Sequence, residues 1–597
     1  GVRHSGDPDS SPDPFPQVAV PLAAGGGLQA ATLRAGLDGP SQANQLDQDI
    51  LEITDDYTRI MGSHQITLGT HNEFFKFRNL FINGANGTWN FTSLDNFELG
   101  LANGFTHTFS NTPDPLQPAR FKVNHMTFYA GDQWRVHPRW TVTYGTRVDV
   151  TRFPDKPTAN PVAVENFGYA TDEVPNNTVW SPRAGFNWDR KGTGREQIRG
   201  GFGLFAGRTP YVWISNQYGT TGVDFTRLSV SNLPASSLLT FVPDPNNQPT
   251  SLAGVTPATN EIDLIHPDFK YPSILRGNLA YDRELPLGLY GTFEFLWSST
   301  VNDVRYENLN LRQTGTLGLD GRPIFSRNVV PTLNDVILLT NTDDGGSWSF
   351  ATEVRRPFSN GLFVNVSYLY GEAETIMDGI RDQALSNWGN VYQPGDPNHP
   401  SLARSDYDPG HRVTVTPSYD FGIGRGYTAT TSVFYSGQSG RPYTLLFGTP
   451  PATSQNLNGD QQNLNDNLYL PTATDQITYT NGTYQDLLLF LQREECTARQ
   501  IGQIMERNSC RAPWINTLDA RVAVNLPVKR VRAEITLDIL NLINLFDPRG
   551  GQFQYAMFND ILAVAPTVTN GVLTTYNLGT ITSPTFQRYT RSDLRSR

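Results

Sequence analysis

The chain has 597 residues and a formal net charge of -11, and its 53 Gly, 41 Pro, 24 Tyr and 33 Phe give it the turn-forming and aromatic bias of β structure. The negative charge argues against nucleic-acid binding, which needs clustered cations. Mean hydropathy is -0.40, and no run of about 18 apolar residues could serve as a spanning helix. The composition therefore excludes membrane helices and leaves membrane strands open.

The beginning of the chain is rich in Pro, Gly and Ser, and we expect an extracellular loop or irregular lead-in over 1–40. The sequence starts at Gly1 without an initiator Met or a signal-peptide pattern. We therefore expect it to be a piece of a longer protein. The first complete strand is expected near 49–61, at the start of a partial barrel domain over 41–597.

Apolar and polar side chains alternate with a period of two in several segments. In 140–153, Trp140, Val142 and Tyr144 share one face, and Thr141 and Thr143 share the other. The same alternation returns at 362–370, 412–421 and 531–539. Several of these segments are about ten residues long, as a tilted membrane strand requires. The pattern predicts strands with an apolar face toward lipid and a polar face toward a lumen.

Short turns and long polar segments alternate between these strands. The turns are expected at 137–139, 191–194, 286–288, 359–361, 424–426 and 527–530, and the long segments at 154–179, 208–271, 302–346, 372–410, 438–512 and 548–588. This alternation distinguishes the periplasmic turns and extracellular loops of an outer-membrane barrel from the connections of a soluble sandwich. We predict an all-β chain that forms an antiparallel transmembrane β-barrel of about 15 strands.

Four tryptophans lie near predicted strand ends, namely Trp134, Trp140, Trp188 and Trp297. They are candidates for the aromatic girdle at the membrane interface. Ordinary packing on a soluble sheet is the alternative interpretation.

Few residues indicate chemistry. The nine His show no HExxH or comparable spacing, and Gly201, Gly203 and Gly207 miss the dinucleotide spacing by one. We predict no catalytic residues and no enzyme activity. Asp460 and Asp466, within an Asn-rich stretch, have the spacing of a calcium loop without its bidentate Glu. A hydrogen-bonded turn is the alternative to calcium.

Several motifs spread over 41–597 resemble the Oar-like TonB-dependent outer-membrane transporters. They are FYAGDQWRVHPRW at 128–140, WSPRAGFNW at 180–188, IRGGFGLF at 198–205, PDFKYP at 267–272, GQSGRPY at 437–443 and LDILNLIN at 537–544. The resemblance implies a barrel of 22 strands, of which this chain would supply the C-terminal majority. The regulatory-like domain, the TonB-binding segment and the plug of the family are not recognisable in the chain.

The resemblance also implies a function. A transporter of this kind lies in the outer membrane among lipid and lipopolysaccharide, and the TonB complex acts on it through a plug absent from this chain. It implies energised uptake or export of an extracellular ligand, such as a peptide, a glycan or a metal chelate. A structural or adhesive outer-membrane protein is the first alternative, and a passive pore is the second. An incomplete barrel leaves two unpaired edges, so we expect either a curved open arc or missing strands supplied by another chain.

The loop between about 437 and 513 is expected to contain one or two short helices near 485–508. Leu487, Leu491 and Ile501 belong to a set of apolar residues that recurs at steps of three and four. Cys496 and Cys510 are the two cysteines of the chain, without metal-site spacing. We predict a disulfide between them that anchors the helical loop to the barrel rim. Two unpaired thiols are the alternative.

Overall fold

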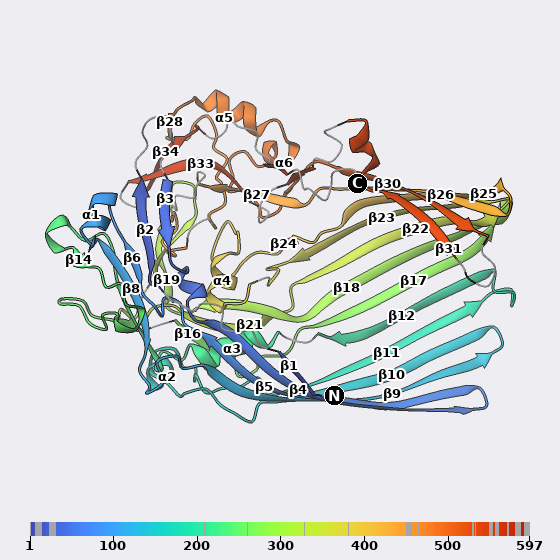
Figure 1. Ribbon diagram of the computed structural model, residues 1–597, viewed down its shortest axis with the longest axis horizontal. Helices are drawn as coiled ribbons and strands as arrows, with labels where there is room; N and C mark the ends of the chain where they lie inside the picture. The colour runs from blue at the N-terminus through green and yellow to red at the C-terminus, as the bar shows by residue number, and fades with distance from the viewer. Residues whose placement is uncertain are drawn as a thin grey trace.

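The computed structural model describes residues 2–5, 15–22, 31–207, 210–259, 261–327, 329–379, 381–448, 456–462, 465–527, 531, 533–547, 553–555, 560–569, 572–579 and 587–589. One large antiparallel sheet curves around a lumen, with short turns at one end and folded loops at the other (Figure 1). Within these residues, no helix is long and apolar enough to cross a membrane.

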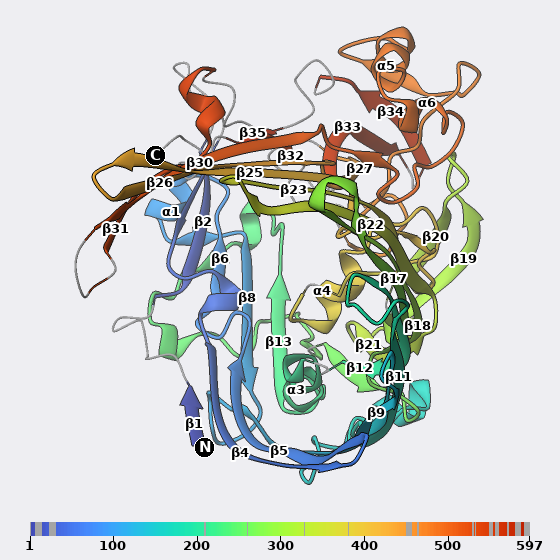
Figure 2. The same ribbon diagram turned by 90° about the vertical axis from the view of Figure 1, so that its right-hand side faces the viewer.

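Fifteen strands of this sheet pair in succession within the described residues. They are β1 (Val2–Ser5), β4 (Asn44–Met61), β5 (His64–Phe81), β9 (Ala119–His137), β10 (Trp140–Arg152), β11 (Asn177–Asp189), β12 (Glu196–Ala206), β17 (Ser273–Leu285), β18 (Leu289–Asn308), β22 (Gly345–Ser359), β23 (Leu362–Thr375), β25 (Gly410–Gly424), β26 (Tyr427–Gln438), β30 (Ile515–Leu526) and β31 (Ala533–Ile539). Figure 2 shows the sheet wrapped around the lumen. The predicted antiparallel barrel fold is confirmed, whereas the open arc stays a prediction.

Two short helices identify the lumenal face of the sheet. α3 (Tyr211–Gly219) and α4 (Ala384–Gly389) lie inside the curve of the strands (Figure 2). Tyr218 of α3 stacks on Phe121 of β9, with ring centroids 4.5 Å apart. Because side chains alternate along a strand, Tyr129 and Gly131 of β9 share the lumenal face with Phe121. The outward face carries the apolar rows that the sequence assigns to lipid.

The short turns join consecutive barrel strands as the sequence predicts. Asn360 and Gly361 have φ of 54° and 79°, and Arg425 and Gly426 have φ of 52° and 84°. Two successive residues with positive φ give the hairpin turn that fits the right-handed twist of paired strands. A further turn at Gly62, between β4 and β5, was missed. Residues 528–530 of the last predicted turn lie outside the described residues.

The long connections contain folded structure of their own. A six-stranded sheet combines β15 (Ala258–Thr259), β13 (Phe225–Val230), β8 (Gly104–Ser110), β6 (Thr88–Asn90), β2 (Gln17–Leu22) and β3 (Ala31–Ala35). A five-stranded sheet combines β28 (Thr478–Thr480), β34 (Val572–Asn577), β33 (Asp560–Thr569), β27 (Pro442–Phe447) and β29 (Cys510–Arg511). The lead-in expected as an irregular loop thus contributes strands to two sheets.

Short elements complete the loop region. The helices are α1 (Leu94–Glu98), α2 (Pro161–Phe167), α5 (Tyr484–Leu491) and α6 (Glu495–Ala498). The strands are β7 (Leu101–Ala102), β14 (Leu239–Thr240), β16 (Ile262–Ile265), β19 (Leu311–Leu317), β20 (Pro323–Arg327), β21 (Val336–Thr342), β24 (Ala403–Arg404), β32 (Phe553–Tyr555) and β35 (Gln587–Tyr589). Buried Trp89, Phe105 and Leu228 form the core of the six-stranded sheet.

The helical loop agrees in part with its prediction. α5 begins at a capping box, in which Thr483 and Asp486 each accept a hydrogen bond from the other's backbone N–H. The helices end at Ala498, ten residues before the predicted boundary at 508. Cys496 and Cys510 are joined by a disulfide. Because Cys510 lies in β29, which pairs with β27, the bond ties α6 to the loop sheet instead of directly to a barrel strand.

Candidate functional site in the barrel lumen

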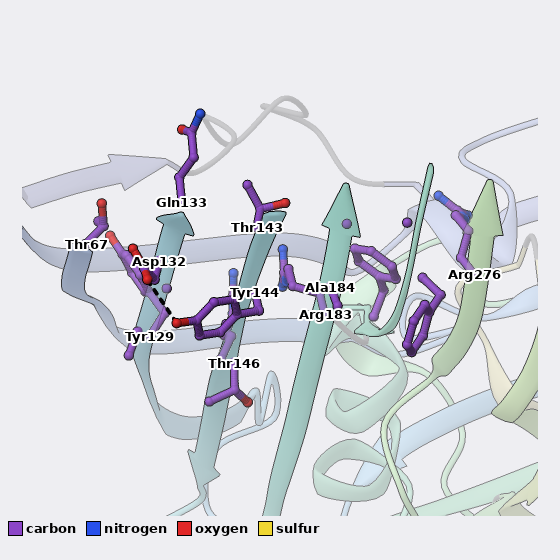
Figure 3. A pocket seen from close by; sticks show the side chains of 18 of the residues that line it. Thr67, Tyr129, Asp132, Gln133, Thr143, Tyr144, Thr146, Arg183, Ala184 and Arg276 are labelled. Carbon is purple, nitrogen blue, oxygen red and sulfur yellow. Dashed lines mark hydrogen bonds between the residues drawn. The ribbon is translucent and has the colours of Figure 1, made fainter. Parts of the chain in front are cut away.

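A cavity lies against the lumenal wall of the sheet, and most of its lining residues belong to β5, β9, β10, β11, β12 and β17. Its volume is about 830 Å³, and Figure 3 shows side chains that line it. Four of its lining residues are glycines that form cross-strand pairs, Gly131 with Gly145 and Gly185 with Gly201. At these four positions the wall has no side chain, so the backbone is exposed and there is room for a ligand or for another polypeptide segment.

Three arginines also line this cavity, and they differ in their partners. Arg147 binds the carboxylate of Asp149, with Nε 2.8 and 2.9 Å from its two oxygens. The guanidinium of Arg183 lies over the ring of Phe205, 5.1 Å from the centroid. Arg276 belongs to β17 and is exposed. The wall is therefore rich in cationic groups although the chain is negatively charged overall.

A second cavity of about 240 Å³ lies between the first and α3. It is lined by His71, Glu73 and His125, and it shares Arg147 with the larger cavity. Both histidines contact strand hydroxyls: Nδ1 of His71 lies 2.8 Å from Thr54 Oγ1, and Nδ1 of His125 lies 2.9 Å from Thr151 Oγ1. These contacts orient polar side chains toward the lumen beneath the helix.

α3 closes the second cavity from the extracellular side. Tyr211 lines that cavity and packs edge to face on Phe75, with centroids 5.0 Å apart. The indole of Trp213 donates a hydrogen bond of 2.8 Å to the carbonyl of Arg381, on the segment that leads into α4. The two helices thus hold each other in the barrel mouth. A solute that entered the lumen from outside would have to displace them or pass beside them.

Two neighbouring carboxylates in β16 and its lead-in bind both helices. Glu261 accepts a hydrogen bond of 3.0 Å from the backbone N–H of Leu385 in α4. Asp263 accepts one from the hydroxyl of Thr220, the residue that ends α3. Burial raises the pKa of Asp263 to about 6 and also raises the pKa of Glu261. This acid pair therefore links the position of the mouth helices to pH.

The two carboxylates proposed as calcium ligands already have protein donors. Asp460 accepts hydrogen bonds from the side chains of Asn458 and Asn465 and from the backbone of Gln462. Asp466 accepts a bond of 2.5 Å from Arg322, on the loop between β19 and β20. No group of three or more His, Cys, Asp or Glu suited to a metal ion occurs in the described part of the chain. The contacts favour the hydrogen-bonded turn.

The girdle tryptophans fall in two groups on the barrel. Trp140 and Trp188 are opposite each other and stack at 5.0 Å, beside the turns. Trp134 stacks on His64 at 5.2 Å near the same end. Trp297 lies further along β18, opposite Trp348, and is 40% exposed. Contact of these side chains with the membrane interface stays a prediction.

Sequence reasoning missed the lumenal wall as a site. A signal was present, because glycines occupy the polar face of several predicted strands, where a side chain would ordinarily point into the lumen. The cross-strand register that brings Gly131 beside Gly145 cannot be deduced from single strands. Arg183 and Arg276 are 93 residues apart in sequence and were likewise not grouped.

Comparison with known proteins gives one family match. A family model described as "Outer membrane beta barrel domain" matches residues 5–589. No curated protein sequence matches the chain significantly.

Similar solved structures include the outer membrane transporter YddB from Escherichia coli, with 13% identity, a TM-score of 0.49 and coverage of 98% of this chain and 58% of that chain. They also include the FrpB iron transporter from Neisseria meningitidis (9%, 0.44, 86% and 55%) and the siderophore receptor PirA from Acinetobacter baumannii (10%, 0.41, 91% and 55%). The chain spans little more than half of the length of these proteins.

Proposed function

The chain belongs to the outer membrane beta barrel domain family, and from that premise we propose that it is the barrel of an Oar-like TonB-dependent transporter. It lies in the outer membrane. The plug and the TonB-binding segment would be encoded outside this sequence. The cargo would be a polar solute such as a peptide, a glycan or a metal chelate, moved by energy from the TonB complex.

The lumenal wall is the observation that supports transport best. Two cavities follow one another along it and share Arg147. The bare backbone at Gly131 and Gly145 leaves space next to charged groups, which suits a surface against which a solute or a plug moves. An adhesive protein would have no need of this space inside the barrel. The helices in the barrel mouth narrow the lumen, which fits gated transport better than an open passive pore.

The test uses the complete gene product, purified in detergent and inserted into planar bilayers. We expect it to bind the periplasmic domain of TonB and to show no large steady conductance. Large conductance without TonB binding would identify a passive pore. If the protein shows no conductance and does not bind TonB, the structural or adhesive alternative is favoured.

A further inference from the structure

We propose that the outward face of β5, β9 and β10 binds the phosphate groups of lipopolysaccharide, the glycolipid of the outer leaflet. The site consists of basic side chains that we call the rim cations: Lys76, Arg78, Arg120, Lys122 and Arg152. The inference rests on the outer-membrane location of the chain and not on transport. It assigns one sector of the barrel wall to one class of lipid headgroup.

The rim cations of β5 and β9 point away from the lumen. Phe121 of β9 stacks on α3 inside the barrel, and side chains alternate along a strand, so its neighbours Arg120 and Lys122 face outward. Arg78 is opposite Arg120, and Lys76 is opposite Lys122. Directly opposite residues share a face of the sheet. All four side chains therefore lie on the lipid side, which a plug inside the barrel would leave uncovered.

Arg152 joins this face from β10. It is opposite Asn124, which comes two residues after Lys122 and so points to the same side. The strands β5, β9 and β10 each have a paired neighbour on both sides (Figure 1). The site thus lies within the paired wall and not at an edge of the sheet.

The rim cations lie where the wall leaves the hydrocarbon of the membrane. Lys76 and Arg152 come twelve residues after His64 and Trp140, which begin β5 and β10 beside the short turns. With a rise of about 3.4 Å per residue and a strand tilt of about 40°, this length crosses about 30 Å, the thickness of the hydrocarbon core. Exposed apolar side chains occupy the same outward face on the way, among them Leu51, Ile53 and Phe128. The cations are therefore level with the headgroups of the outer leaflet.

Two pairs of like charges stand directly opposite each other in this site. One is Lys76 with Lys122, and the next along the same face is Arg78 with Arg120. Their Cβ atoms are about 5 Å apart, and like charges in this position destabilise a sheet. A phosphate bound between the pairs would replace this repulsion by attraction.

Protein carboxylates balance only part of the positive charge. Arg78 is the one rim cation that forms an ion pair with another described residue, and its partner Asp47 lies 3.1 Å away. The carboxylate of Asp155 accepts a hydrogen bond of 2.9 Å from the backbone N–H of Lys122. The carboxylates beside the five cations on these strands and their connections are Asp47, Asp49 and Asp155. The site therefore keeps an excess of positive charge.

The outer rim is not basic all the way round. Glu372 of β23 is opposite Trp348 on the outward face, and Glu374 follows two residues later. Glu374 also comes twelve residues after Leu362, which begins its strand, so it lies at about the same level as the rim cations. The cations are thus gathered in one sector, which is the arrangement of a site and not of a general attraction to the membrane.

A phosphorylated glycolipid matches both parts of this surface. Guanidinium and ammonium groups donate charge-assisted hydrogen bonds to phosphate oxygens, and basic clusters at a membrane surface attract anionic headgroups. The acyl chains of the same molecule would lie on the exposed apolar side chains beneath the cations. A soluble phosphate would gain only the first contact, so the geometry favours the lipid.

The first experiment measures lipid binding to the complete, delipidated protein in neutral detergent with EDTA, by native mass spectrometry. The probes are phosphorylated lipid A, the same lipid with its phosphates removed, phosphatidylglycerol and inorganic pyrophosphate. We expect phosphorylated lipid A to bind about tenfold or more tighter than each other probe. Equal binding of the two forms of lipid A would overturn the proposal. Equal binding of phosphatidylglycerol would reduce the site to general lipid attraction, and displacement of lipid A by equimolar pyrophosphate would assign it to a soluble phosphate; both results also overturn it.

The second experiment compares Arg120→Gln/Lys122→Gln with Arg34→Gln/Arg312→Gln, a control that removes the same charge from exposed positions of the loop strands β3 and β19. We expect lipid A to bind about twenty-fold more weakly to the first variant, since each cation contributes about fivefold, and normally to the control.

The melting temperature gives an independent readout of the same variant. Without lipid A, Arg120→Gln/Lys122→Gln should melt no lower than the unmodified protein, because the like-charge pairs are gone. With lipid A, the unmodified protein should melt higher than the variant, because binding stabilises the folded state. Equal weakening of lipid binding in the control, or a lower melting temperature of the variant without lipid, would overturn the site. TonB binding is measured separately and does not depend on the result.

Discussion

On the barrel wall, Leu279 and Ile535 are 54% and 62% exposed, whereas Trp89 and Phe105 of the six-stranded loop sheet are fully buried. The wall leaves its apolar side chains outside because lipid covers them. The loop sheets bury their apolar side chains as a water-soluble protein does. Two regions of one chain therefore depend on different solvents, and substitutions should affect them independently.

The largest expected effect tests whether the loop sheet has a core of its own. Trp89→Ala should cost the six-stranded sheet about 3–5 kcal/mol, because it empties a fully buried site. Hydrogen exchange in β6 and β8 should rise, while the heat-modifiable mobility of the folded barrel should not change. The control Leu33→Ala, at a position that is 43% exposed, should cost less than about 0.5 kcal/mol. Loss of the barrel in Trp89→Ala would contradict the independence of the two regions.

Removal of the disulfide tests the stability of the five-stranded loop sheet, which contains Cys510 in β29. The Cys496→Ser/Cys510→Ser variant opens a link across 14 residues, which is worth about 3 kcal/mol in the chain-entropy model. We expect faster hydrogen exchange in α5 and in β29. Exchange in the barrel strand β26 is the internal reference, and acceleration there of equal size would show that the loop sheet and the wall unfold together.

The two regions also differ in how far the sequence could predict them. Alternation in 140–153 is a local signal, so strands, short turns and membrane location followed from it. The loop sheets join segments such as β2 and β6, or β27 and β33, that are far apart in the sequence, and no local pattern specifies such pairs. The lumenal site lies between these cases. The sequence shows its glycines, but which glycines pair across neighbouring strands depends on the strand register, which the sequence of a single strand does not give.

A pH dependence should separate the mouth helices from the wall. Asp263 has its pKa raised to about 6 by burial, from an ordinary value near 3.8. The folded mouth therefore keeps a proton that the unfolded chain loses, so docking of α3 and α4 is strongest below about pH 4 and weakens as pH rises to about 6. For each proton released, the free energy of docking weakens by at most about 1.4 kcal/mol per pH unit.

Hydrogen exchange of α3 and α4, corrected for the intrinsic effect of pH, measures how the docking of these helices depends on pH. Thr220 and Glu261 face Asp263, and Arg227 acts on Glu261. Asp263→Asn should flatten the profile, because its amide cannot ionise. A profile that stays steep in Asp263→Asn would assign the dependence to Glu261, and a flat profile in the unmodified protein would remove the acid pair from the mouth.

The smallest expected effect concerns calcium at the Asn-rich loop. A calcium ion needs several free oxygen ligands, but Asp466 is held by Arg322, and Asp460 by Asn458, Asn465 and Gln462. We therefore expect millimolar calcium to leave the melting temperature of the unmodified protein unchanged within about 1 °C, a shift worth a few tenths of a kcal/mol or less.

Arg322→Gln is the informative variant. It leaves Asp466 buried without its guanidinium, so the loop should lose stability and calcium should restore part of it. A calcium shift of several degrees in the unmodified protein that disappears in Asp460→Asn/Asp466→Asn would instead establish a calcium loop, and this part of the extracellular surface would then be held by a metal ion and not by contacts between loops.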